Sequence, residues 1–203
     1  MSVRSQHGKA AFDAVWEKSR QFAAALEPRL GTLLEPLAIA FAGNNVQLHG
    51  VLENCRRGTH LRWRCASMKG KDRLAVWLDH LILNIAAAEG YPLHSMMIAS
   101  DAVLELPPVE GAAEIMADLL HLYCEGMKRP LRFFPETSWS FLKDGLPTAE
   151  RSWHGDQGMG FHGECDNQAV ALCFGGEEPW GEEFGALAER IYGPLVAVMK
   201  YKT

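Results

Sequence analysis

Residues 46–65, VQLHGVLENCRRGTHLRWRC, predict two β-strands joined by a tight turn. The first strand covers residues 46–54, and Arg56-Arg57-Gly58-Thr59 forms the turn. Strand side chains alternate between two faces, so Arg62 and Arg64 share one face of the second strand. The opposite face carries Leu61, Trp63 and Cys65.

The elements on either side of this segment are a helix and a further strand. Residues 10–26 predict an amphipathic helix that ends near Pro28, because its apolar side chains recur every three or four positions. These are Phe12, Val15, Trp16, Phe22, Ala23 and Leu26. Residues 37–41 are apolar and the turn-forming residues 42–45 follow them, so we expect a three-strand meander.

The helix that the sequence predicts most clearly follows Lys69 and stops at Gly90. Its apolar stripe includes Trp77, Leu78, Leu81 and Ile82, which we expect in the core. Residues 96–99 and 103–106 predict a strand pair, 112–123 a helix closed by Gly126, and Phe133-Phe134 a short strand. Residues 145–179 fit loop and short helix equally well. Residues 181–199 predict a helix interrupted near Gly193-Pro194, which completes an α/β (α+β) domain with a mixed central sheet flanked by helices.

Composition narrows the class of protein. The 203 residues, 48% of them hydrophobic, suffice for a single buried core. A net charge of −5 argues against a surface that binds nucleic acid over its whole extent. Five cysteines without regular spacing fit a reducing compartment, and no run reaches the ~18 apolar residues of a membrane span. We therefore expect a cytoplasmic protein.

The order of helix, three strands, helix and strand resembles the core of the restriction-endonuclease-like nucleases. Active members of that class carry an acid on the second strand and an acid-x-Lys on the third, because two carboxylates hold Mg²⁺. Glu53 falls at the first position, but Arg62 and Arg64 fill the acid-x-Lys positions. A guanidinium cannot bind a cation, so the resemblance implies a nuclease-like core without an active site. The alternative is that these three residues are the solvated face of a half-exposed sheet.

Other catalytic motifs are absent from the sequence or incomplete. No phosphate-binding G-x-x-x-x-G-K-[ST] loop or G-x-S-x-G elbow occurs. His162-Gly163-Glu164 lacks the cysteine pair of the zinc deaminases, and Cys124 and Cys165 lack the spacing of a thiol hydrolase. We expect no catalytic residue, metal or cofactor.

A basic cluster is the local exception to the acidic balance. Two interpretations of this cluster stay open: a patch that contacts phosphates, and an ordinary charged surface. The candidate nucleic-acid-binding residues are Arg56, Arg57, Arg62, Arg64, Lys69 and Lys71, and Arg73 completes the cluster.

A longer set of residues resembles the C-terminal domain of the gamma subunit of exodeoxyribonuclease V, the RecC family. Its most specific part is the string PLRFFPETSW at 130–139, and residues 47–50, 61–64 and Pro194-Leu195 add to it. The positions that carry the resemblance, to which we assign structural or interface roles, are Trp77, Asp79, His80, Tyr123, Gly126, Pro130, Phe133, Phe134, Pro135, Glu136 and Trp139. In residues 133–139 we expect Pro135 to fix the backbone, the aromatic rings to anchor it and Glu136 to accept hydrogen bonds.

The resemblance implies a noncatalytic domain of a helicase–nuclease that processes double-strand breaks for homologous recombination. It implies the beta (RecB) and alpha (RecD) subunits as partners, with DNA bound through the full complex. It also implies a domain cut from a longer chain, with residues 10–203 as the nuclease-like domain and 1–9 as a flexible segment or one added for expression. Two rivals stay open: a divergent Mg²⁺ nuclease that uses Glu53 with Asp79 or Glu136, and a free-standing interaction domain.

Overall fold

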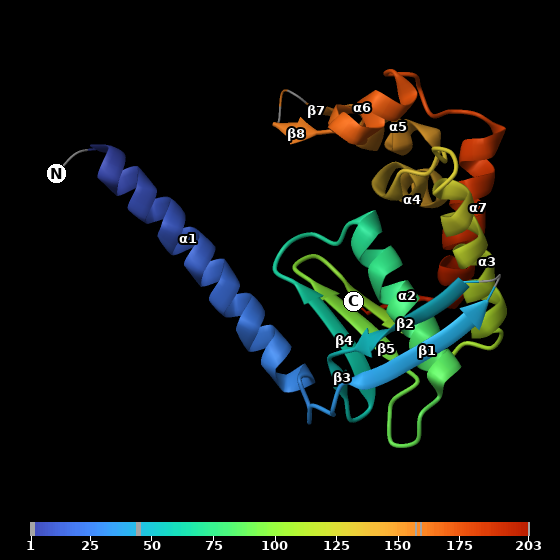
Figure 1. The fold of residues 1–203 in the computed structure, drawn as a ribbon. Helices are drawn as coiled ribbons and strands as arrows, with labels where there is room; N and C mark the ends of the chain where they lie inside the picture. The colour runs from blue at the N-terminus through green and yellow to red at the C-terminus, as the bar shows by residue number, and fades with distance from the viewer. Residues whose placement is uncertain (1–2, 44–45, 157, 159, 203) are drawn as a thin grey trace.

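A mixed five-stranded sheet lies at the centre of the protein, in a computed structural model that describes residues 3–43, 46–156, 158 and 160–202 (Figure 1). Strand β4 pairs parallel with β5, and the other neighbours pair antiparallel. The order is β3 (Cys55–Arg56), β4 (Thr59–Arg64), β5 (Ser95–Ala99), β6 (Val103–Leu106) and β9 (Lys200–Lys202). Helices flank this sheet, which confirms the predicted fold class.

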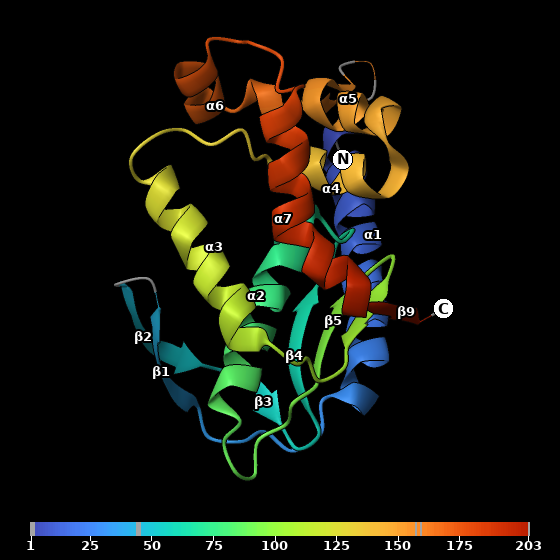
Figure 2. The same cartoon turned by 90° about the vertical axis from the view of Figure 1, so that its right-hand side faces the viewer.

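Helix α2 (Gly70–Ala86) packs on one face of the sheet, and three further helices pack around α2 (Figure 2). These are α3 (Ala112–Gly126), α4 (Pro135–Asp144) and α7 (Glu182–Val198). Helix α2 ends at Ala86, before the predicted stop at Gly90, and the next residue, Ala87, adopts a left-handed conformation. Trp77, Leu81 and Ile82 are buried as expected, whereas Leu78 is only partly buried.

The predicted three-strand meander is wrong, because the first two strands form a sheet of their own. Strands β1 (Leu37–Gly43) and β2 (Val46–Leu52) pair only with each other in the described chain. Asn54 then adopts a left-handed conformation, with φ of 58°, and turns the chain before β3 begins. Strand β4 therefore pairs with β3 and β5 and not with β2. In the predicted turn at 42–45, Asn44 and Asn45 lie outside the described residues.

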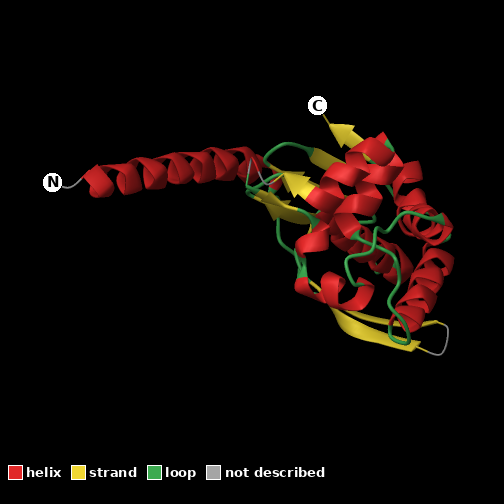
Figure 3. Ribbon diagram, turned by 90° about the horizontal axis from the view of Figure 1, so that it is seen from above, coloured by secondary structure: helices red, strands yellow, loops and turns green. Residues whose placement is uncertain are grey.

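Helix α1 (Val3–Leu26) begins earlier than Ala10 and projects from the rest of the molecule (Figure 3). Only its last turns pack on the sheet, where Leu26 is buried against Leu61 and Ile98. Farther along the same stripe the side chains reach solvent. The exposed fractions are 66% for Phe12, 66% for Val15 and 62% for Trp16.

The C-terminal third corrects two further predictions. Phe133 and Phe134 lie outside any strand; Phe134 is extended and precedes α4, whose first residue is Pro135. Helix α7 continues through Pro194 to Val198 without interruption. Between these helices, α5 (Leu146–His154) and α6 (Gln168–Phe174) lie above α4 in Figure 1.

Short strands complete the chain. In the same C-terminal segment, β7 (Gly155–Asp156) pairs with β8 (Phe161–His162). Strand β9 was not predicted, because three residues carry too little alternation to be recognised. No described helix is long and apolar enough to cross a membrane.

His80 connects α2 to the sheet from a fully buried position. Its Nε2 lies 3.0 Å from the carbonyl oxygen of Pro107, which can only accept, so Nε2 carries the proton. Nδ1 then accepts from the Ser95 hydroxyl, 3.0 Å away. Burial lowers the pKa of His80 from 6.5 to about 4, so the folded protein keeps this ring neutral.

This neutral histidine predicts a loss of stability in mild acid. Between pH 6.5 and 4 the unfolded chain binds a proton that folded His80 refuses, so the free energy of unfolding falls as the pH drops. From pH 7 to pH 5, wild type should lose about 2 kcal/mol more than His80→Gln in urea titrations. The lowered pKa of His60 acts in the same direction but is common to both proteins. Parallel pH profiles would contradict the assignment.

Candidate functional site

A cleft of about 550 Å³ opens between the end of β2, strand β4 and helix α2. We call it the arginine cleft; Glu53, Arg62, Arg64, Asp72 and Asp79 line it. The structure therefore brings the three positions of the expected degenerate nuclease site to one place.

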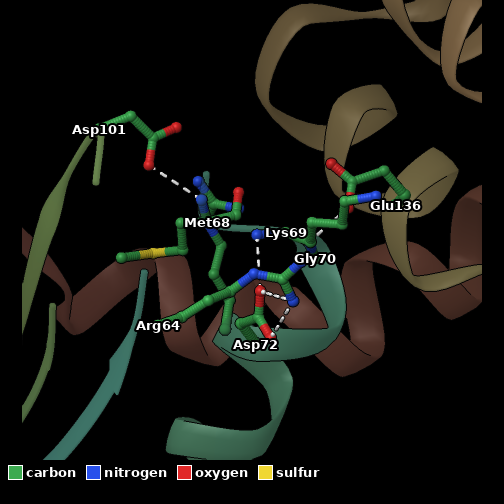
Figure 4. A network of polar contacts seen from close by, with 8 residues as sticks. Arg64, Met68, Lys69, Gly70, Asp72, Asp101 and Glu136 are labelled. Atoms are coloured by element: carbon green, nitrogen blue, oxygen red, sulfur yellow. Dashed lines mark hydrogen bonds and ion pairs between the residues drawn. The ribbon is translucent and has the colours of Figure 1, made fainter. Parts of the chain in front are cut away.

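Two ion pairs join the sheet to the helix across this cleft. Strand alternation points Arg62 and Arg64 to the same side, and α2 presents Asp79 and Asp72 to them roughly two turns apart. Arg62 donates from Nε to Asp79. Nη1 of Arg64 lies 3.2 Å from each carboxylate oxygen of Asp72, as Figure 4 shows. Each arginine of the R-x-R pair is thus neutralised by its own carboxylate.

His60 is a member of this group that the sequence analysis missed. It is buried, and its Nε2 lies 3.4 Å from Oδ2 of Asp79. Burial lowers the pKa of His60 although Asp79 acts to raise it, which favours the neutral ring. The period of two that relates Arg62 to Arg64 extends back to His60 and could have identified it.

Of the acids needed by the rival nuclease hypothesis, Glu53 and Asp79 line the arginine cleft, whereas Glu136 does not. Glu53 is exposed at the mouth of the arginine cleft, and Asp79 is paired with Arg62. Glu136 accepts from Gly70 at the N-terminus of α2, which lies between two and three turns of helix from Asp79. No group of three His, Cys, Asp or Glu side chains suited to a metal ion occurs among the residues that the structure describes.

A second polar network surrounds the start of α2 (Figure 4). Glu136 accepts a hydrogen bond from the backbone N–H of Gly70 at 2.6 Å, and Asp72 accepts one from Lys69 at 3.0 Å. Carboxylates at this end of a helix satisfy free N–H groups and favour the helix dipole. Burial raises the pKa of Glu136.

Helix α4 is capped in the same way by a residue from farther along the chain. Glu164 accepts from the backbone N–H groups of Glu136 and Thr137 at 3.1 and 2.7 Å. The glutamate of the H-x-E sequence therefore serves a helix terminus, while His162 lies 3.2 Å from Asp166. The carboxylates of Glu136 and Glu164 thus connect the start of α2, the start of α4 and the segment that carries Glu164.

Residues 133–139 lie mostly in the interior. Phe134 packs edge-on against Trp153, and Trp139 packs against Tyr192. Phe134 and Trp139 are buried, and Phe133 is partly buried beside Tyr192.

The other residues that carry the family resemblance lie in different surroundings. Trp77 stacks on His80, and Tyr123 is exposed. Leu131 lies close to Gly126. Pro130 is exposed.

The basic cluster is less available than its sequence indicates. Arg73 is buried, donates to the carbonyl oxygen of Met68 and lies over the Trp139 ring, so its inclusion in a surface patch was wrong. Arg56 donates to the carbonyl oxygen of Leu30 at 2.7 Å. Arg62 is exposed but paired with Asp79, so the exposed members outside the ion pairs of the described chain are Arg57, Lys69 and Lys71.

The fold and this site define a mixed α/β domain whose arginine-bearing strand is tied to its central helix by ion pairs. A sequence model of a protein family, the RecC C-terminal domain, matches residues 4–146, which is more than half of the chain. The chain therefore belongs to the RecC C-terminal domain family.

Two curated relatives are similar over part of this chain. The RecBCD enzyme subunit RecC of Escherichia coli (strain K12) is 29% identical over 133 residues, 63% of this chain and 12% of that protein. The RecBCD enzyme subunit RecC of Buchnera aphidicola subsp. Acyrthosiphon pisum (strain APS) is 31% identical over 99 residues, 47% of this chain and 9% of that protein. The matched regions amount to about a tenth of these relatives' length.

The approach of α2 to α4 predicts that Gly70 tolerates no side chain. A Cβ atom there would lie 2.1 Å from the carbonyl oxygen of Pro135. Gly70→Ala should therefore lower the free energy of unfolding by about 1–3 kcal/mol, measured by urea denaturation. The control is Gly185→Ala in α7, where the nearest atom lies at an ordinary van der Waals distance of 3.6 Å and stability should hold or rise. Equal effects of the two substitutions would contradict the close contact.

Proposed function

We propose that this chain acts as a noncatalytic C-terminal domain of the gamma subunit of a RecBCD-type exodeoxyribonuclease V. In this role it scaffolds the beta (RecB) and alpha (RecD) subunits and guides separated DNA strands during double-strand break repair by homologous recombination. Residues 10–203 form the nuclease-like domain, and the complex works in the cytoplasm. Membership of the RecC C-terminal domain family supports this proposal.

The observation that carries the noncatalytic part is the pair of ion pairs in the arginine cleft. A two-carboxylate metal site needs free oxygen ligands, and a nearby guanidinium repels a divalent cation. Arg62 and Arg64 occupy the strand positions that would supply an acid and a lysine, and they also engage Asp79 and Asp72. Freeing either aspartate for a metal would leave an arginine without its partner.

The domain should not cut DNA. We expect no cleavage of single- or double-stranded DNA by the purified chain with Mg²⁺ or Mn²⁺, while an active complex of the same class cuts the same substrates in parallel. The Glu53→Ala variant should behave like wild type. Metal-dependent cleavage that disappears in Glu53→Ala would refute the noncatalytic role and favour the divergent nuclease.

DNA contact by this domain alone should be weak and independent of sequence. The net charge of −5 opposes phosphate approach, and only three exposed cluster residues lie outside the ion pairs of the described chain. In salt titrations of labelled duplex DNA, the triple substitution of Arg57, Lys69 and Lys71 by Gln should lower the log–log salt slope by up to about 0.9 per lost phosphate contact. Lys143→Gln, also exposed, is the control. Tight binding that survives high salt would show that DNA is held elsewhere.

A further inference from the structure

The carboxylate of Asp79 has two competing partners in the arginine cleft. Its Oδ2 atom accepts from Nε of Arg62 and lies 3.4 Å from Nε2 of His60. Arg62 and His60 are two positions apart on β4, so both reach α2 from the same face of the strand. Solvent reaches 44% of the Arg62 side chain but only 2% of the His60 side chain. One carboxylate oxygen therefore connects a buried ring to an exposed guanidinium.

The His60 ring stays neutral while Arg62 holds Asp79. A carboxylate only accepts hydrogen bonds, so Nε2 carries the proton of the neutral ring. Nδ1 is buried and has no hydrogen-bond partner in the described chain. A second proton on Nδ1 would place a charge and an unpaired N–H in the interior, which is costly unless a full opposite charge compensates it. Asp79 supplies that full charge only when Arg62 leaves it.

The other ionisable groups around the ring do not supply this charge. The groups that the surrounding elements present are Asp79 and His80 of α2, Arg62 of β4, Cys55 of β3, His94 before β5 and Glu53 of the cleft. Burial raises the pKa of the Cys55 thiol to about 11, so this thiol stays uncharged. The two neighbouring histidines only repel a charged ring, and Glu53 is exposed to solvent, which screens it. Among the described residues, Asp79 is therefore the acid that pairs with a protonated His60.

The charge balance of the cleft changes with this proton. Two arginines and three carboxylates line the cleft, so one negative charge is in excess and opposes a phosphate. A proton on His60 cancels this excess, and transfer of Asp79 to the ring leaves the exposed Arg62 guanidinium without its partner. Lys69, whose backbone N–H donates to Asp72, adds an exposed cation beside the cleft. The protonated cleft thus suits a phosphodiester, which the neutral cleft repels.

We propose that His60 makes DNA contact in the arginine cleft depend on pH: a proton on the buried ring transfers Asp79 from Arg62 to His60, and the released Arg62 contacts a phosphate of the strand. Protonation and phosphate binding favour each other, because both require the same exchange of partners at Asp79. This inference rests on the proposed function, in which the domain guides DNA strands, and it names the residue and the condition for the contact.

An NMR titration of the His60 ring tests the exchange without DNA. Arg62→Gln removes the competitor for Asp79 and should raise the pKa of His60, whereas Asp79→Asn should lower it. The matched control is Arg64→Gln, which removes the arginine paired with Asp72 and should leave the pKa of His60 unchanged. A pKa of His60 that is equal in wild type and Arg62→Gln would overturn the proposal.

The second measurement is the Kd of the chain for a labelled single-stranded oligothymidylate between pH 7.5 and pH 5.5 at constant low salt. The wild-type Kd should fall as the pH drops, by up to about tenfold per pH unit, which is the limit for uptake of one proton. His60→Gln and Arg62→Gln should each lose most of this dependence. His121→Gln, which removes a half-exposed histidine of α3, is the control and should keep it. Circular dichroism at both pH values should show all variants folded as wild type.

The outcomes separate this inference from the proposed function. Equal pH dependence in wild type and Arg62→Gln would overturn the exchange of partners, and so would an oligonucleotide that the chain binds at no pH. Binding of the same wild-type chain to purified beta and alpha subunits, measured at pH 7.5, tests the scaffolding role and does not depend on His60. Failure to bind either subunit would refute that role, while a pH-dependent DNA contact that is lost in Arg62→Gln would still support this inference.

Discussion

The backbone contact between Gly70 and Pro135 determines how the sheet and the C-terminal helices fit together. With no side chain at Gly70, the first turn of α2 comes close enough for Glu136 to accept its N–H group. Glu164 holds α4 in the same manner, so the position of α2 depends on a segment almost a hundred residues away in the sequence. Because α2 carries Asp72 and Asp79, this contact also sets the geometry of the arginine cleft.

Buried charged side chains in this protein mainly connect secondary-structure elements to one another. Arg73 donates to Met68 and to Tyr201 of β9 and lies over the Trp139 ring, so one guanidinium contacts the chain on three sides. Removing a partner from such a group leaves a buried charge uncompensated, which costs far more than the net gain of forming the pair. A run of basic residues in the sequence therefore overstates the positive charge that a binding partner would meet.

The sequence predicted the parts of the fold that rest on local periodicity. Alternation around Arg62 and Arg64 assigned their common face, and the spacing of Trp77 and Leu81 identified the buried stripe of α2. It failed where a single residue redirects the chain. The left-handed Asn54 separates the hairpin from the main sheet.

The sequence analysis also could not predict contacts between residues that are far apart in the sequence. The carboxylates that neutralise the two arginines come from a helix, and no spacing within the strand reveals which residues they are. Pro194 was expected to break α7, but the buried side chains of Tyr192 and Leu195 on either side hold the helix continuous. Tertiary packing thus overrides a strong local signal.

The attachment of α1 makes this helix a lever. Its 24 residues extend for about 36 Å, and only the turns near Phe22 and Leu26 rest on the sheet. A rotation of about 10° at this hinge would carry the far end through roughly 6 Å, given that length. Small rearrangements in the packing around Leu61 are therefore amplified into large displacements at the tip, and a force applied to the tip is in turn concentrated on a few apolar contacts.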